Sequence, residues 1–263
     1  MGEKSVVTLA LLGECQELEK EKNYSGALLC YENILKYDTT SREALLGCAR
    51  IYYKSKNYSE TLSKISILLQ RYPDAWEGWI LRGKCYFYLN DIDNAMAAFK
   101  TVLEINPSNT DALYYVGLLH LWLNQASAAI EYFRKAIELG GKILYKIGLA
   151  NACIFAKRYD EAEQILNEIV QKRGGHFAHF YLALLHYFEN RYNQALEEVD
   201  SFISRHKGNG WGLWLKVVIL EAMGDYSTAQ KVAEKAKRYM PRPHFDKPIV
   251  SIKSTTNILS ENT

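Results

Sequence analysis

Three histidines that lie close together in the sequence are the residues best suited to chemistry. His176, His179 and His186 fall within one segment, and the last two are seven positions apart, which on a helix brings them to nearly the same face. Imidazoles placed in this way can bind zinc when further ligands complete the site. Because no cysteine or carboxylate joins them at a ligand spacing, we expect neither a metal nor another cofactor.

The cysteines offer a second possible chemistry, either disulfide formation or metal binding. They are an odd, scattered set of five without any Cys-x-x-Cys pair: Cys15, Cys30, Cys48, Cys85 and Cys153. This pattern predicts reduced cysteines that behave as small, buried hydrophobic residues.

Other chemistry has no counterpart in the sequence. It contains no Gly-rich phosphate loop, no nucleophile elbow and no His-Glu-x-x-His motif, so we expect no catalytic residues and no enzymatic activity. The net charge of +2 creates no general attraction to nucleic acid or to an anionic membrane. Residues 231–253 are locally basic but lack an aromatic-basic motif, so a nucleic-acid-associated assembly is only an alternative.

The N-terminal residues and the most apolar runs indicate in which cellular compartment the protein is expected. Residues 1–20 contain several glutamates and do not form a secretory signal. The most apolar runs, 112–123 and 210–223, are too short to span a bilayer. We therefore expect an intracellular protein, cytoplasmic or nuclear, without membrane insertion.

The elements that position these residues follow from an internal repeat. A small residue recurs every 33 or 34 positions, at Ala27, Thr61, Ala95, Ala129, Ala162, Ala195 and Ala229. Each follows a short polar turn, and apolar residues at helical spacing lie on both sides of that turn. Each repeat is therefore predicted to be two antiparallel helices, the second capped by Ser25, Ser59, Asp93, Ser127, Asp160, Asn193 or Ser227.

The third repeat carries the clearest family pattern, in Trp79, Gly83, Tyr86, Ala95, Phe99 and Pro107. At these positions the chain resembles the tetratricopeptide repeat family, with Arg82 as a departure where leucine is usual. The resemblance implies an all-α fold, a right-handed α-solenoid of about seven helix-turn-helix repeats. We place the solenoid at 1–243, with repeats at 8–41, 42–75, 76–109, 110–142, 143–175, 176–209 and 210–243. A flexible tail is expected at 244–263.

The resemblance also implies where a partner would bind, because the first helix of each repeat lines a concave groove in that family. Removing the core positions from these helices leaves a largely aromatic set that we expect to be exposed. The predicted partner-binding residues are Tyr53, Phe87, Tyr88, Tyr114, Tyr115, Leu118, Trp122, Phe155, Phe177, Phe180, Tyr181, Tyr187, Trp211 and Trp214. The alternative is that some of these rings pack between repeats as core.

The groove composition favours a protein or peptide partner with apolar anchors. Some members of the family hold a chaperone carboxylate with lysine and asparagine side chains. Here the matching positions carry Leu12 and Gln16, Leu46 and Arg50, and Ile80 and Lys84. The leading hypothesis is thus a non-catalytic interaction scaffold or adaptor, with a co-chaperone or targeting receptor as the alternative.

Two further contacts are possible. An alternative to a flexible tail is that the apolar residues of 244–252 fold back into the groove as a ligand of the chain itself, because a tether gives a high effective concentration. Self-association through the ends of the solenoid is a second alternative, since no separate C-terminal capping helix follows the seventh repeat.

Overall fold

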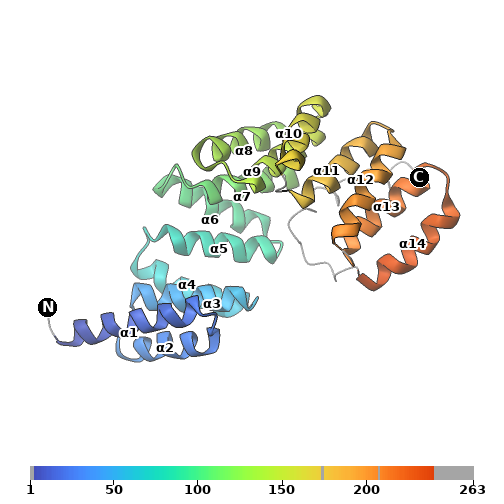
Figure 1. Cartoon of the computed structure of the whole chain (residues 1–263). Helices are drawn as coiled ribbons and strands as arrows, with labels where there is room; N and C mark the ends of the chain where they lie inside the picture. The colour runs from blue at the N-terminus through green and yellow to red at the C-terminus, as the bar shows by residue number, and fades with distance from the viewer. Residues whose placement is uncertain (1–2, 173–174, 207, 240–263) are drawn as a thin grey trace. The chain divides into compact units, whose positions relative to one another are not determined.

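The computed structural model describes residues 3–172, 175–206 and 208–239, with side chains from residue 10 onward except that of His176. Within these ranges the chain forms fourteen α-helices and no strand (Figure 1). The predicted all-α repeat fold is confirmed. The predicted tail 244–263 lies outside the described residues.

The chain divides into two compact units, 1–112 and 113–263, with the boundary inside α7. Unit 1 contains α1 (Glu3–Lys20), α2 (Tyr24–Tyr37), α3 (Arg42–Lys54), α4 (Tyr58–Arg71), α5 (Trp76–Tyr88), α6 (Ile92–Ile105) and the start of α7 (Thr110–Trp122). Unit 2 contains the rest of α7, then α8 (Ala126–Gly140), α9 (Ile143–Phe155), α10 (Tyr159–Gln171), α11 (His176–Phe188), α12 (Tyr192–Arg205), α13 (Gly210–Ala222) and α14 (Tyr226–Tyr239).

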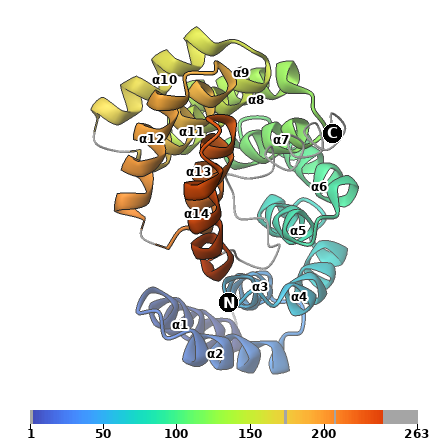
Figure 2. The same ribbon diagram turned by 90° about the vertical axis from the view of Figure 1, so that its right-hand side faces the viewer.

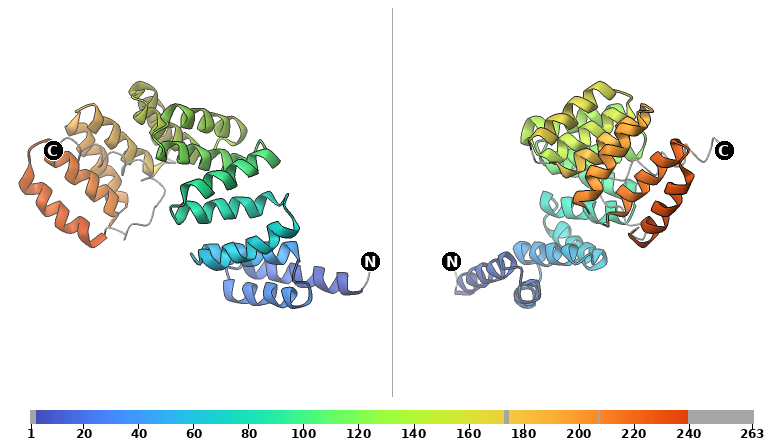
Figure 3. Two further views of the ribbon diagram at one scale, coloured as in Figure 1. Left: turned by 180° about the vertical axis from the view of Figure 1, so that it is seen from behind. Right: turned by 45° about the vertical axis from the view of Figure 1, so that its right-hand side comes forward.

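Within each unit, consecutive helices pack side by side as hairpins. Figure 2 shows this for α1 with α2 and Figure 1 for α13 with α14, and the left view of Figure 3 agrees. A helix pair of this kind cannot bury its apolar face alone, so each hairpin also packs against the next one in its unit.

The hairpin turns share one backbone geometry. In the first, Asn23 N–H donates to Leu18 O at 2.9 Å and Lys22 N–H donates to Glu19 O at 3.1 Å, which ends α1 in a Schellman motif. The residue two positions before the second helix has a positive φ in every hairpin, between 57° and 62° at six positions and 80° at the glycine: Lys22, Lys56, Asn90, Asn124, Lys157, Asn190 and Gly224.

The second helices begin earlier than predicted. Asn23 caps α2 by accepting a hydrogen bond from Gly26 N–H, and Asp91 caps α6 by accepting one from Asn94 N–H. The predicted caps Ser25 and Asp93 lie inside the first turn, two positions further on. The cap predictions are wrong because the Schellman turn closes directly onto the new helix.

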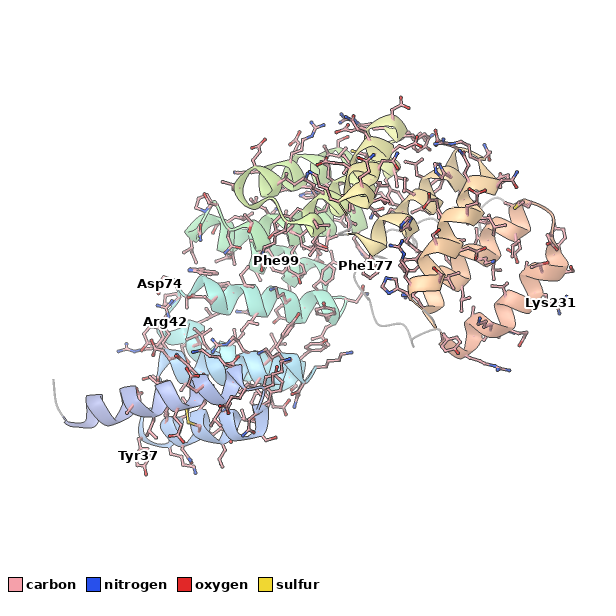
Figure 4. All side chains as sticks on the ribbon, in the orientation of Figure 1. Tyr37, Arg42, Asp74, Phe99, Phe177 and Lys231 are labelled. Carbon is pink, nitrogen blue, oxygen red and sulfur yellow. A yellow bond between two sulfur atoms is a disulfide. The ribbon has the colours of Figure 1, made fainter. Side chains whose placement is uncertain are left out.

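Small residues allow the helices to approach closely. The seven repeated small residues from Ala27 to Ala229 are all buried. A Cβ added at Gly83 would lie 2.8 Å from Phe99 Cε1, and one added at Gly117 would lie 2.8 Å from Phe133 Cε1, so these glycines admit a neighbouring ring. Figure 4 labels Phe99, which is fully buried in unit 1.

A disulfide joins the two helices of the first hairpin. Cys15 in α1 and Cys30 in α2 are bonded, with their Cα atoms 5.4 Å apart (Figure 4). The prediction of reduced cysteines is therefore wrong for this pair, since folding places two residues distant in sequence on facing helices. Cys48, Cys85 and Cys153 are free and buried, as predicted.

None of the helices in the described residues combines the length and the apolar composition needed to cross a lipid bilayer.

Candidate interaction surface

The first helices of unit 1 carry a polar surface that includes predicted groove residues. Tyr53 on α3 and Tyr88 on α5 are partly exposed, as expected for partner contacts. Phe87, next to Tyr88, is only 2% exposed and belongs to the core, so its predicted exposure is wrong. Arg50 on the same face of α3 as Tyr53 and Lys84 on α5 are also partly exposed.

Three tyrosines form a cluster across the second and third hairpins. The rings of Tyr58 on α4 and Tyr88 are stacked, with centroids 5.8 Å apart and planes 3° apart. Tyr53 contacts both rings, at 6.0 Å from Tyr58 and 6.1 Å from Tyr88. Stacked and tilted pairs of this kind contribute roughly 0.5–1.5 kcal/mol each beyond their buried area, so the cluster is held in place before any partner binds.

A shallow hollow lies on the first helices of the first two hairpins. It is lined by Gln16, Glu19 and Lys20 of α1 and by Arg50 and Lys54 of α3. The Glu19 carboxylate accepts hydrogen bonds from Arg50 Nε at 3.3 Å and Arg50 Nη2 at 2.9 Å, and from Lys54 Nζ at 3.1 Å. The two cations and one carboxylate leave this group with a net positive charge.

The environment of Glu19 keeps it ionised. Burial raises the pKa of Glu19, but the hydrogen bonds from Arg50 and Lys54 outweigh burial and hold the pKa below its ordinary value. The Tyr31 hydroxyl also donates to Glu19, at 3.4 Å. Burial, followed by the charge of Glu19, raises the pKa of Tyr31, so the phenol stays protonated and serves as a donor.

The positions that would form a chaperone-carboxylate clamp do not form one. Leu12, Leu46 and Ile80 are buried in the described structure. Arg50 is engaged by Glu19, and Lys84 Nζ lies 3.5 Å from a carboxylate oxygen of Asp111.

The first helices of unit 2 are mostly interior. Tyr114 contacts Phe133 of α8 and Tyr145 of α9, with ring centroids 5.7 and 5.4 Å away. Burial alone strongly raises the pKa of Tyr181. The predicted exposure is wrong for five residues of this unit, all of which are at most 5% exposed: Tyr114, Tyr115, Leu118, Phe180 and Tyr181.

The remaining predicted residues of unit 2 retain accessible surface. Phe177 is 40% exposed. Trp211 and Trp214 on α13 contact each other edge to face, with centroids 6.4 Å apart, and the ring of Tyr187 contacts Tyr192 at 6.1 Å. Five of these residues are partly exposed: Trp122, Phe155, Tyr187, Trp211 and Trp214.

His179 and His186 of α11 differ in their surroundings. His179 Nδ1 lies 2.6 Å from a carboxylate oxygen of Glu198 on α12. Burial, followed by the charge of Arg191, lowers the pKa of His186, so this buried imidazole is neutral at pH 7. The side chain of His176 is not among those described, and among those that are, no three metal-binding side chains come together.

The free thiols are poor nucleophiles. Burial raises the pKa of Cys48 to about 11, that of Cys85 to about 12 and that of Cys153 to about 11. Because the thiolate is the reactive form, these cysteines are structural.

Sequence reasoning missed Glu19, Lys54 and Tyr58 as members of this surface. Helical spacing does place Arg50 and Lys54 on one face of α3, which was an available signal. Their meeting with Glu19 of the preceding hairpin depends on packing between repeats and leaves no local pattern in the sequence.

Family models agree with this architecture. A tetratricopeptide repeat model matches residues 76–109, which contain α5 and α6, and a second tetratricopeptide repeat model matches residues 111–139 of α7 and α8. This chain is a tetratricopeptide repeat protein. Proteins built from these repeats generally act as non-catalytic scaffolds for protein–protein interaction, and the fold supports that general role.

Several solved structures share the fold. A tetratricopeptide repeat protein from Parabacteroides merdae aligns with a TM-score of 0.76 and 18% identity, covering 95% of this chain and 98% of that one. PilW, a type IV pilus biogenesis factor, aligns with a TM-score of 0.66 and 18% identity, covering 81% and 98%. MamA aligns with a TM-score of 0.55 and 21% identity, covering 60% and 94%. At these identities the likeness concerns the fold alone. A comparison with curated proteins gives no match.

Proposed function

We propose that this tetratricopeptide repeat protein is a non-catalytic adaptor whose first-helix surface in unit 1 binds a segment of a partner protein. The segment combines an apolar or aromatic anchor with an acidic group. The observation that carries the proposal is the partly exposed cluster of Tyr53, Tyr58 and Tyr88, because the hairpin that holds Tyr53 and Tyr58 also supplies Arg50 and Lys54 to the hollow.

The two parts of this surface meet on α3. Arg50 and Tyr53 are one helical turn apart, and Lys54 follows Tyr53 directly. Tyrosine rings supply large contact area at a small cost in side-chain entropy and are frequent anchors at interfaces. The excess positive charge around Glu19 favours a carboxylate on the partner. We therefore expect a partner segment that carries both apolar and acidic side chains, rather than one with apolar anchors alone.

The partly exposed aromatic residues of unit 2 are proposed as further anchors for a peptide or helix. They are Trp122, Phe155, Phe177, Tyr187, Trp211 and Trp214. An adaptor in an intracellular complex remains the hypothesis for the biological setting. The co-chaperone alternative is tested separately, by measuring whether C-terminal chaperone peptides bind the intact protein.

Affinity purification with a double variant tests the adaptor proposal. The intact protein and the variant Tyr53→Ala/Tyr88→Ala are used to capture partners from the cells that make the protein. A captured partner is then purified, and its affinity is measured by calorimetry. We expect a roughly 30-fold loss of affinity, equivalent to about 2 kcal/mol at two interface anchors.

The matched control is Tyr37→Ala, which removes a ring that is 90% exposed on α2 (Figure 4). It should capture the same partner with unchanged affinity. Thermal denaturation confirms that each variant is folded. Equal affinities for the folded double variant and the intact protein would contradict the proposal.

A further inference from the structure

The last hairpin presents an aromatic stripe on its first helix. Trp211, Trp214 and Val218 are at positions i, i+3 and i+7 of α13 and therefore lie on one face. All three are partly exposed, whereas Leu213, Leu215 and Ile219 on the other faces are buried.

The preceding hairpin shows how the position of Trp214 is covered. Its counterpart Phe180 is 1% exposed, whereas Phe177, the counterpart of Trp211, is 40% exposed. Phe177 and Phe180 of α11 precede Trp211 and Trp214 by one repeat of 34 residues. Phe202 of α12 packs against both phenylalanines, with ring centroids 5.8 Å from Phe177 and 5.4 Å from Phe180.

The last hairpin lacks that covering ring. One repeat after Phe202, α14 carries Ala236. A methyl group replaces a phenyl ring there, so α14 cannot cover Trp214 as Phe202 of α12 covers Phe180.

The fourth hairpin also has an alanine at this position, but a residue from the next hairpin covers the ring on its first helix. Ala136 of α8 is at the position of Ala236, yet Tyr114 of α7 is buried. The ring of Tyr145, from the next first helix, lies 5.4 Å from Tyr114 and covers it. After α14 the described residues contain no further helix, so any cover of this kind must come from elsewhere.

The end of α14 lies close to the residues that precede α13. The ring of Tyr239, the last residue of α14, lies beside Gly208, two residues before α13, and a Cβ added to Gly208 would be 3.0 Å from it. The connections between α2 and α3, α4 and α5, α6 and α7, and α12 and α13 are each four residues long: 38–41, 72–75, 106–109 and 206–209. Counted along the sequence, a connection of the same length after Tyr239 would end at residue 243, so that a next first helix would begin at His244.

The sequence that follows has suitable side chains. Phe245 comes 34 residues after Trp211, one full repeat, and Ile249, Val250 and Ile252 add apolar surface. We propose that residues 244–252, which lie outside the described residues, bind the Trp211–Trp214–Val218 face of α13 in the place of a next first helix. The chain thereby occupies one of its own aromatic surfaces.

Charge supports this face over the outer face of α14. That helix exposes Lys231, Lys235, Lys237 and Arg238, against Glu234. The segment 240–252 carries Arg242 and Lys247 against Asp246, so it is repelled by the outer face of α14.

The tether makes a weak contact sufficient. A short linker gives an effective concentration on the order of 1 mM, so a segment with an intrinsic Kd of about 0.1 mM is bound about nine-tenths of the time. A competing ligand of the same face then binds about tenfold more weakly than it would to a free face.

Competition with a synthetic peptide of residues 244–256 tests the proposal in the full-length chain. The labelled peptide is titrated into the intact protein and into Phe245→Asp/Ile249→Asp, and binding is followed by fluorescence anisotropy. We expect the double variant to bind the peptide about tenfold more tightly, because its own segment no longer competes. The control Ile258→Asp, which alters an apolar residue beyond the proposed contact, should behave as the intact protein does.

A second variant identifies the face. Adding Trp214→Ala to the double variant should abolish peptide binding while circular dichroism and the melting temperature show a folded chain. Equal peptide affinity for the intact protein and the double variant, or peptide binding that survives the loss of Trp214, overturns the proposal. So does sedimentation showing that the intact protein is a dimer dispersed by Trp214→Ala, since the occupant is then a second copy.

Discussion

In unit 1, Tyr53 and Tyr88 remain partly exposed beside basic side chains, whereas in unit 2, Tyr114 and Tyr181 lie on first helices but are buried. All four are tyrosines in apolar segments with helical spacing. The ring contacts differ accordingly. Phe133 and Tyr145 of neighbouring helices pack on Tyr114, whereas the rings of Tyr53 and Tyr88 contact each other and Tyr58. A ring on a first helix is therefore surface or core according to the residues that adjacent hairpins place over it.

Replacing one tyrosine of each unit by alanine should give the largest effect and tests whether the buried and the partly exposed rings differ in their contribution to stability. Tyr114→Ala leaves a cavity in a packed core and should lower the free energy of unfolding by about 3 kcal/mol or more. Tyr53→Ala removes a partly exposed ring with its contacts to Tyr58 and Tyr88 and should lower it by about 1–2 kcal/mol. Urea denaturation followed by circular dichroism measures both, and equal losses would show that Tyr53 is core as well.

Reduction of the disulfide should affect unit 1 alone. The bond between Cys15 and Cys30 spans 15 residues, a separation for which loss of the crosslink costs about 3 kcal/mol. Hydrogen exchange of the intact protein with and without dithiothreitol should show faster exchange in α1 and α2 and no change in α9 to α13.

The matched control is Cys15→Ser/Cys30→Ser, which should exchange rapidly under both conditions. Thiol labelling of the protein in its own cells also tests the predicted intracellular location, because such bonds persist mainly in oxidising compartments. A fully reduced pair there would agree with that location.

Glu19 should make the stability of unit 1 depend on pH. Its pKa in the folded protein is below the ordinary value of 4.5, so its ion pairs stabilise the fold above pH 4.5, and this contribution is lost as the pH falls through the folded pKa. Because Arg50 and Lys54 are partly in solvent, we expect about 1 kcal/mol.

The variant Glu19→Gln should lose that pH-dependent contribution, measured as the urea midpoint between pH 3 and pH 7. Glu17→Gln is the control, since Glu17 forms only an exposed pair with Lys20 at 2.5 Å and should leave the pH profile unchanged. If the urea midpoint of Glu19→Gln depends on pH as that of the intact protein does, the ion pairs of Glu19 do not contribute to the pH dependence of stability.

The turn residues should give the smallest effects and apply to both units. Lys56 has a φ of 60°, which glycine adopts without cost, so Lys56→Gly should stabilise the protein by about 0.5–1 kcal/mol. Lys64→Gly within α4 should instead destabilise it by about 1 kcal/mol. Thermal melts distinguish the two signs, and destabilisation by both substitutions would contradict the positive-φ argument.

The fold was predictable from the sequence because its signal is repeated. Small residues such as Ala95 and Ala129 recur once per hairpin and are buried wherever they occur. Only part of the interaction surface was predictable, because exposure depends on contacts between hairpins. Neither the coverage of Tyr114 by Tyr145 nor the meeting of Glu19 with Arg50 has a local pattern. The Cys15–Cys30 bond was missed for the same reason.

The common geometry of the hairpin turns has a consequence for how the length of this chain can change. Lys22, Lys56 and Asn90 pass through nearly the same φ, and the backbone enters and leaves each turn through the same hydrogen bonds. Removing the residues between two such turns, for example 23–56, therefore joins two compatible ends. We therefore expect that whole repeats can be deleted or duplicated during gene rearrangement. The remaining helices then keep their alternating directions and their pairing in hairpins.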